Sequence, residues 1–221
     1  AAHGALLVVD NTFTTPAMFR PMEHGADIVI NSITKFLAGH SDLTLGYVAA
    51  RDPRLRTAIY DAAVTWGTTP SPFDCWLAER GLHTFDLRFE KAQATAASLA
   101  DALAGRDGIR QVIYPGRADH PHHNRAGTLF GGQFGNMLSF EIEGGRDEVN
   151  SFVMNAGGIP FAPTLGDVGC TLSHPASSSH RALTTEGRTA LGISEGYFRL
   201  SVGIEAPELV LAELDAALAA V

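Results

Sequence analysis

Two side chains of complementary chemistry follow two short apolar runs near the start of the chain. Leu6-Leu7-Val8-Val9 leads into Asp10, and the run at 27–30 leads to Lys35, one of only two lysines in the 221 residues. Short runs rich in β-branched residues predict buried strands. If the two strands are parallel, Asp10 and Lys35 lie at their carboxyl ends, where ligand crevices of open α/β sheets form.

This pair of residue types suits Schiff-base chemistry. A desolvated lysine such as Lys35 favours the neutral amine that condenses with an aldehyde. A carboxylate such as Asp10 would keep a pyridine nitrogen protonated, which makes the ring an electron sink, as in pyridoxal phosphate. Ser32 and Thr34 add short hydroxyls that can hold phosphate oxygens. The alternative is a strand-end lysine with helix-capping hydroxyls and a surface Asp.

The elements that must position these residues follow an α/β pattern in the first half. Asp52-Pro53 supplies an N-cap and a first-turn proline for a helix. We expect a crossover helix within 16–25 that stops at Gly25, a strand at 45–50 and a helix at 53–64. A mostly helical stretch should follow at 72–103, with a break near Gly81. Its last part, from 90 to 103, is Ala-rich and should form one long helix.

The second half has a different pattern, with separated strands and helices typical of an α+β unit with an antiparallel sheet. Gly105 to Gly108 is the expected boundary. The expected elements are strands at 111–114, 136–143 and 197–204, a helix at 147–155 that ends at Gly157-Gly158, and a terminal helix to Val221.

Composition excludes several classes of protein. The net charge is −8, 45% of the residues are hydrophobic, and the basic residues are scattered, which argues against a nucleic-acid or anionic-membrane partner. No stretch approaches the ~18 to 20 consecutive apolar residues of a membrane span, and no secretory pattern opens the chain. We expect a globular cytoplasmic protein. Cys75 and Cys170 are expected to be two buried free thiols without a disulfide or metal.

Four motifs in order along the whole chain resemble the Cys/Met-metabolism pyridoxal-phosphate enzymes, the group of cystathionine γ-synthases and γ-lyases, methionine γ-lyases and O-acylhomoserine sulfhydrylases. The motifs are Asp10-Asn11-Thr12-Phe13-Thr14-Thr15-Pro16, Asn31-Ser32-Ile33-Thr34-Lys35-Phe36 with Gly39-His40-Ser41-Asp42, Pro175-Ala176-Ser177-Ser178-Ser179-His180, and Arg199-Leu200-Ser201-Val202-Gly203-Ile204-Glu205. The resemblance implies fold type I of the pyridoxal-phosphate-dependent transferases. Residues 1–104 would be the end of the large, mostly parallel-sheet cofactor domain with its linking helices, and 105–221 the small α+β C-terminal domain.

The resemblance also implies roles for single residues. Lys35 matches the Schiff-base lysine, Asp10 the partner of the ring nitrogen, and Ser32 and Thr34 the phosphate-contacting hydroxyls. Arg199 matches the residue that grips the substrate's α-carboxylate, a task suited to a guanidinium fork on a rigid strand. Thr164, in Thr164-Leu165-Gly166, stands where the family usually has a serine that helps to hold that carboxylate.

Other family features are expected upstream of Ala1. The chain enters a core-type strand almost at once, as if in the middle of a βαβ series. The family's cofactor-stacking tyrosine, its glycine-containing phosphate loop, and the tyrosine and arginine lent by a neighbouring subunit would precede this point. We therefore expect the C-terminal portion of a longer enzyme, or a natural truncation.

Two other motifs carry rival hypotheses. Ser32-x-x-Lys35 also fits the signature of serine acyl-enzymes such as β-lactamases, but their later Lys-Thr-Gly strand would need a lysine after Lys91, and none follows. His120-Pro121-His122-His123 could suggest a metal site, but adjacent histidines point apart and no carboxylate has useful spacing, so we expect a polar loop and no metal.

The sequence therefore predicts a pyridoxal 5′-phosphate enzyme of sulfur amino-acid metabolism. It would catalyse γ-elimination or γ-replacement on a homoserine-type or thioether amino acid, a small-molecule substrate. The resemblance implies a dimer or tetramer of full-length chains. The alternative is an inactive, truncated family member that serves as an oligomerisation or interaction module.

Overall fold

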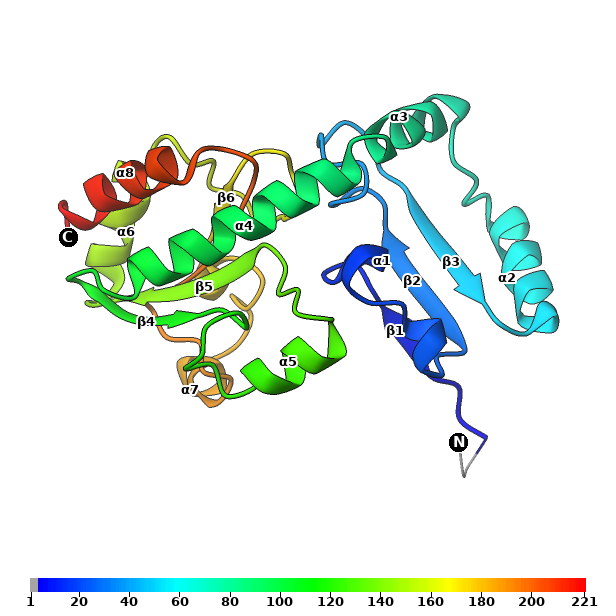
Figure 1. The fold of residues 1–221 in the computed structure, drawn as a ribbon, viewed down its shortest axis with the longest axis horizontal. Coiled ribbons are helices and arrows are strands. Elements are labelled where there is room, and N and C mark those ends of the chain that lie inside the picture. Colours follow the sequence, from blue (N-terminus) through cyan, green and yellow to red (C-terminus); the bar gives the residue numbers. More distant parts are fainter. Residues whose placement is uncertain (1–3) are drawn as a thin grey trace. The chain divides into compact units, whose positions relative to one another are not determined.

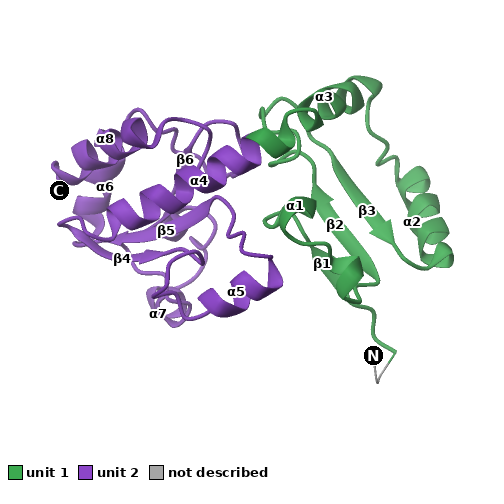
Figure 2. Ribbon diagram, in the orientation of Figure 1, with its two compact units in different colours: residues 1–87 green, residues 88–221 purple. Residues whose placement is uncertain are grey.

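The computed structural model describes residues 4–221, which form two compact units (Figure 1; Figure 2). Unit 1 is Ala1–Leu87 and unit 2 is Arg88–Val221. The first sheet has three strands, all in unit 1, and the second has four, all in unit 2. The expected entry into the first strand at Ala1–His3 lies outside the described residues.

The sheet of unit 1 contains the parallel pair that the sequence predicts, but the expected burial is wrong for the first strand, where Val8 is 50% exposed. Strand β1 (Val8–Asp10) pairs in parallel with β2 (Ile28–Ser32), and Asp10 lies opposite Ile30. Strand β3 (Gly46–Ala50) pairs with β2 on its other side and is antiparallel. Asp10 is the last residue of β1, whereas the sequence analysis places it directly after a strand at 6–9.

The connection from β1 to β2 differs from the expected single crossover helix. It consists of two short pieces, α1 (Thr15–Met18) and the 3-10 helix η1 (Pro21–His24). Pro21 explains the interruption, because proline lacks a backbone N–H and disfavours helical geometry in the residue before it. Gly25 ends η1 as expected, with a left-handed φ of 91°.

Three helices follow β3, and the first of them starts with the expected cap. They are α2 (Pro53–Trp66), α3 (Pro72–Leu82) and α4 (Phe85–Leu103), the last of which continues into unit 2. Asp52 Oδ1 caps α2 by accepting a hydrogen bond from Arg54 N at 2.8 Å. The helical stretch breaks at 83–84, close to the expected break near Gly81. Gly81 itself lies in the last turn of α3, where a Cβ would come within 2.6 Å of the Ala38 carbonyl oxygen.

Unit 2 contains the antiparallel sheet that the sequence predicts. The strand order is β4 (Ile109–Ile113), β5 (Met137–Ile142), β7 (Tyr197–Ser201) and β6 (Thr171–Ser173). One face of this sheet shares a core with α4, α6 (Arg146–Asn155) and α8 (Pro207–Leu218). The remaining elements are α5 (His123–Leu129), α7 (Thr185–Ala190) and the 3-10 helix η2 (Pro175–Ser177).

Helix α4 explains where the two units divide. Its residues Ala96, Leu99, Ala100 and Leu103 belong to the core of unit 2. The compact units therefore separate between Leu87 and Arg88, before the packed part of α4. The division into domains at 104/105 stays a prediction.

Candidate functional site

Asp10 is connected to the end of β2 through one side chain, that of Thr12. Asp10 Oδ1 accepts hydrogen bonds from the Thr12 hydroxyl at 2.6 Å and from Thr12 N at 3.0 Å. The same hydroxyl accepts a hydrogen bond from Ser32 N at 2.9 Å. Asp10 and Ser32 lie on the same face of the sheet, because Asp10 pairs with Ile30 and side chains alternate along a strand.

Two buried asparagines brace the same region. Asn31 Nδ2 donates to the Asn11 carbonyl at 3.0 Å, and Asn11 Nδ2 donates to the Phe19 carbonyl at 2.9 Å. Both asparagines are almost fully buried. The carboxyl ends of β1 and β2 are thus held together by side-chain bonds in addition to the strand pairing, which fixes the position of Asp10.

Lys35 lies in the turn that follows β2. Its N–H donates to the Ser32 carbonyl at 3.3 Å, and its carbonyl accepts from Gly39 N at 2.8 Å. Lys35 is half-buried, whereas the next three residues, Phe36, Leu37 and Ala38, are buried. Ala38 packs with Ala78 of α3. The turn is therefore anchored, and the backbone of Lys35 is joined through Ser32 and Thr12 to Asp10.

The hydroxyls of Ser32 and Thr34, near Lys35, differ in their hydrogen bonding. The Ser32 hydroxyl forms no hydrogen bond within residues 4–221. The Thr34 hydroxyl donates to the Leu45 carbonyl at 3.1 Å and accepts from Leu45 N at 2.9 Å. Ser32 can therefore donate to a phosphate as it stands, while Thr34 would have to release Leu45 first.

Arg199 lies on the face of β7 opposite the core of unit 2. Its strand neighbours Phe198 and Leu200 are fully buried in that core, while Arg199 pairs with Ser139 and Ser173. Its Nε is buried and lacks a hydrogen-bond partner among the described residues. Burial lowers the pKa of Arg199 from its ordinary value. A guanidinium stays charged even so, and an uncompensated buried cation of this shape favours a carboxylate ligand.

Thr164 is brought next to Arg199 by its backbone. Arg199 Nη2 donates to the Thr164 carbonyl at 3.4 Å. Thr164 begins the loop 164–170 that leads to β6. Within unit 2 the structure therefore brings together the two residues that the sequence assigns to the substrate carboxylate, and the contact uses the carbonyl of Thr164.

The sequence reasoning missed Thr12 as a connecting residue. Its spacing from Asp10 is the signal that could have found it, because an Asp side chain commonly accepts hydrogen bonds from the residue two positions later.

The expectation of two buried thiols is wrong for Cys75, which is exposed on α3, whereas Cys170 is buried. A cysteine on the outer side of a helix with no covering element has no reason to be buried.

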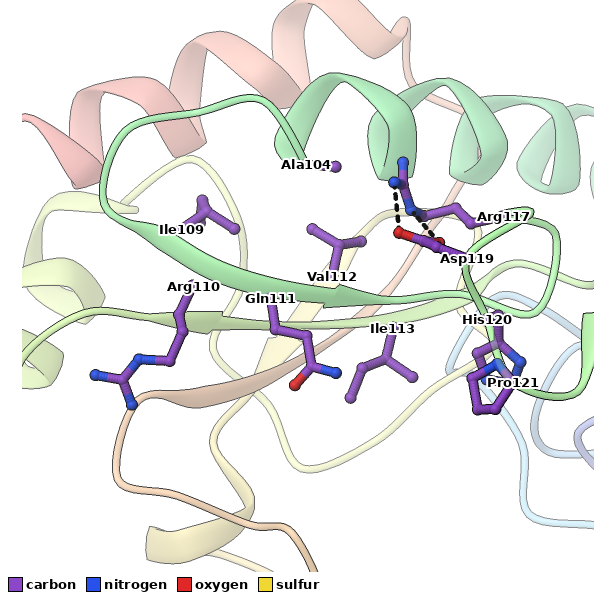
Figure 3. Close-up of a pocket in the computed structure, with 10 residues that line it drawn as sticks. All are labelled: Ala104, Ile109, Arg110, Gln111, Val112, Ile113, Arg117, Asp119, His120 and Pro121. Carbon is purple, nitrogen blue, oxygen red and sulfur yellow. Dashed lines mark hydrogen bonds and ion pairs between the residues drawn. The ribbon is translucent and has the colours of Figure 1, made fainter.

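The histidines of the segment 120–123 contact other parts of the protein. His123 Nδ1 lies 2.9 Å from the Pro115 carbonyl oxygen, and its ring stacks on Phe134 with centroids 5.1 Å apart. His120 borders a cavity of about 370 Å³ beside β4, where Arg117 is paired with Asp119 (Figure 3). Among residues 4–221, no three His, Cys, Asp or Glu side chains are grouped as a metal site would require.

Two further observations bear on rival hypotheses. Residues 33–38 form a turn, whereas the Ser-x-x-Lys motif of serine acyl-enzymes opens a helix. None of the helices in the described part of the chain is both long and apolar enough to cross a membrane.

Similarity to solved structures places the fold in the class of pyridoxal-phosphate-dependent enzymes of fold type I. The crystal structure of cystathionine gamma synthase from Xanthomonas oryzae pv. oryzae in complex with aminoacrylate and cysteine matches with a TM-score of 0.92 and 45% identity, over 98% of this chain and 56% of that one. This confirms the fold class that the sequence predicts.

The family follows from sequence comparison. A family model described as Cys/Met metabolism PLP-dependent enzyme matches residues 1–219, and the chain belongs to that family. Cystathionine beta-lyase MetC of Bacillus subtilis is 43% identical over 203 residues, which are 92% of this chain and 52% of the relative. Cystathionine gamma-lyase of Dictyostelium discoideum is 39% identical over 217 residues, 98% of this chain and 56% of the relative.

Two consequences follow from these matches. The family's cofactor is pyridoxal phosphate, which confirms the cofactor expectation. The chain spans about half the length of the curated relatives that it matches.

Proposed function

We propose that this chain supplies the lysine and the carboxylate with which a trans-sulfuration enzyme binds pyridoxal phosphate. The observation that supports this most is the hydrogen-bonded path from Asp10 through Thr12 to Ser32, at the carboxyl ends of two parallel strands. It joins an acid to the turn that carries Lys35. Crevices at such strand ends are the usual ligand sites of open α/β sheets.

Each residue of this group has a distinct task in the proposal. Lys35 would hold the cofactor covalently and would move protons as base and acid during turnover. Asp10 keeps the ring nitrogen protonated through Oδ2, since Oδ1 already accepts two bonds from Thr12. Ser32 and, after releasing Leu45, Thr34 hold the phosphate. When bound, the cofactor supplies an electron sink for the substrate carbanion.

Arg199 and Thr164 bind the substrate's α-carboxylate in this proposal. The orphan Nε of Arg199 and its half-buried position support this role, because a carboxylate would satisfy the guanidinium with two parallel bonds. A carboxylate held by two parallel bonds restricts the orientation of the bound amino acid.

The reaction itself is the finer part of the proposal. We propose γ-elimination or γ-replacement on a thioether or homoserine-type amino acid, in the cytoplasm, by a dimer or tetramer of full-length chains. The relatives' names divide between β-lyase, γ-lyase and γ-synthase. Incubation with cystathionine separates the two lyase activities: γ-cleavage yields cysteine, 2-oxobutanoate and ammonia, whereas β-cleavage yields homocysteine, pyruvate and ammonia.

The cofactor assignment is tested by reduction and peptide mapping of the natural full-length protein. Borohydride should fix pyridoxal phosphate irreversibly on the peptide that contains Lys35. Lys35→Ala should abolish both this adduct and the visible absorbance, while Lys91→Ala, the matched control on the exposed side of α4, should change neither. A protein with no adduct and no absorbance would support the inactive, non-catalytic alternative.

A further inference from the structure

The loop 164–170 is attached to β7 and to the residues that follow it by several separate bonds. Gly166 N donates to the buried Ser201 hydroxyl at 2.9 Å, and Ile204 N donates to the Val168 carbonyl at 2.9 Å. Arg199 Nη2 contacts the Thr164 carbonyl at the start of the loop. The loop therefore runs along the strand that carries the proposed carboxylate-binding arginine.

Glu205 makes the attachment at the far end of the loop. Its carboxylate accepts hydrogen bonds from Cys170 N at 2.6 Å and from the Cys170 thiol at 3.2 Å. The sulfur in turn accepts a hydrogen bond from Gly203 N at 3.2 Å. Burial raises the pKa of the Cys170 thiol to about 12, so the thiol keeps its proton and remains a donor to Glu205 at neutral pH.

The backbone around this attachment is closely packed. A Cβ at Gly203 would collide with the Val168 carbonyl oxygen, lie 2.6 Å from the Gly169 carbonyl carbon and lie 2.5 Å from Glu205 Oε2. Only glycine leaves room for the loop to approach the segment after β7 this closely. A shift of Cys170 away from Glu205 would therefore be transmitted along a short, tightly packed loop to Thr164.

We propose that Glu205 is a positioning residue for the substrate carboxylate, because by holding Cys170 it fixes the loop 164–170 and so the place of Thr164 beside Arg199. The proposal rests on the proposed function, in which Arg199 binds that carboxylate. Glu205 itself does not touch the substrate. Its carboxylate accepts one hydrogen bond on each oxygen, and because the acceptor is charged these bonds are stronger than bonds to a neutral acceptor.

The test compares two ligands that differ only in the carboxylate, glycine and methylamine, on the full-length holoenzyme. Each is titrated while the cofactor absorbance is followed. Glu205→Gln turns one acceptor oxygen into a donor amide, so we expect glycine affinity to fall roughly tenfold or more while methylamine affinity stays constant. With the natural substrate, KM should rise by a similar factor and kcat should change less.

Control variants separate this inference from the proposed function. Glu208→Gln, on the exposed first turn of α8, should leave both affinities unchanged. Arg199→Lys should weaken glycine binding and spare methylamine. If Arg199→Lys leaves glycine affinity unchanged, the carboxylate assignment fails; if it weakens glycine binding but Glu205→Gln does not, only the role of Glu205 fails.

A second pair of variants covers the case in which Glu205→Gln does not fold. Cys170→Ala removes the thiol donor but keeps the bond from Cys170 N, so it should weaken glycine binding in the same selective way by a smaller factor. Cys170→Ser retains a donor and should restore most of that affinity. Equal losses for glycine and methylamine in the Cys170→Ala protein would show a general structural defect and overturn the proposal.

Discussion

The two units differ in how they position their candidate residues. In unit 2, Phe140, Phe152 and Phe198 are at most 1% exposed, and Phe152 and Phe198 have ring centroids 4.9 Å apart. In unit 1, the large apolar side chains Tyr60 and Trp66 are 70% and 81% exposed. None of the described side chains of α2 is buried.

This difference shows two ways of fixing a functional side chain. Arg199 is held by a continuous core, because its strand neighbours are locked in close-packed surroundings. Asp10 and Lys35 instead depend on side-chain hydrogen bonds and on a small apolar cluster around Ala38, Leu43 and Ala78. Elements with few buried apolar contacts open at lower free energy, so we expect amide exchange to be faster in unit 1.

The largest expected effect comes from truncating one aromatic side chain in each unit. Phe198→Ala leaves a cavity between Phe140, Phe152 and His174, and it should destabilise unit 2 by about 3–5 kcal/mol. Trp66→Ala removes an exposed ring and should change the stability of unit 1 by less than about 0.5 kcal/mol. Hydrogen exchange resolved by residue measures both. Equal losses would mean that the contrast between the units is wrong.

The second prediction concerns the hydrogen-bonded path of unit 1. Thr12→Val keeps the shape of the side chain but removes the acceptor of Ser32 N and the donor to Asp10, which should cost about 1–3 kcal/mol locally. The amide of Ser32 should then exchange faster, and pyridoxal phosphate should bind more weakly. Thr12→Ser retains the hydroxyl and is the matched control. Unchanged exchange in the Val variant would remove Thr12 from the path.

The parts of the fold that the sequence predicted are those fixed by local signals. The β-branched runs gave the parallel pair β1 and β2, and Asp52-Pro53 gave the start of α2. The break near Gly81 was also predicted, and it lies between α3 and α4, but the close approach of Gly81 to the Ala38 carbonyl is remote in sequence and left no local signal. Strand β6 was missed because it has only three residues, which are too few for a strand pattern to be recognised. Two of them, Thr171 and Ser173, are polar although they are buried.

The candidate site shows the same limit. The residue types at 10, 32, 34, 35 and 199 are the basis of the proposed chemistry, but the partners of each side chain are set by tertiary contacts. The Thr34 hydroxyl is occupied by Leu45, eleven residues away, and the only described partner of Arg199 near the loop is a carbonyl 35 residues away. Such contacts depend on strand register, which a motif does not specify.

The third prediction uses the buried histidine of unit 2. His174 Nε2 contacts the Glu195 carbonyl at 2.7 Å, near the side chains of Glu195, Arg146 and Arg188, and burial lowers the pKa of His174. The folded state then binds fewer protons than the unfolded state, so this contribution to stability is complete above about pH 6.5 and is lost as the pH falls below it.

The measurement is the unfolding free energy of unit 2 between neutral and mildly acidic pH. The slope due to one proton can be no steeper than about 1.4 kcal/mol per pH unit. His174→Gln, which keeps a donor for the Glu195 carbonyl, should flatten the profile in this window. Exchange in unit 1 serves as the internal control, and an unaltered slope in the variant would assign the pH dependence to another group.

The smallest expected effects come from matched helix caps, one in each unit. Ser71 Oγ accepts from Asp74 N at 3.1 Å at the start of α3, and Thr184 Oγ1 accepts from Gly187 N at 3.1 Å at the start of α7. Replacing either residue by Ala should cost about 1 kcal/mol, while Asp, which can also cap, should cost little. Because α3 packs against the turn that carries Lys35, Ser71→Ala should also speed exchange at residues 33–38, whereas Thr184→Ala should leave that turn unchanged. Faster exchange confined to α3 alone would show that the turn is held independently of the helix, and the small apolar cluster would then not be what positions Lys35.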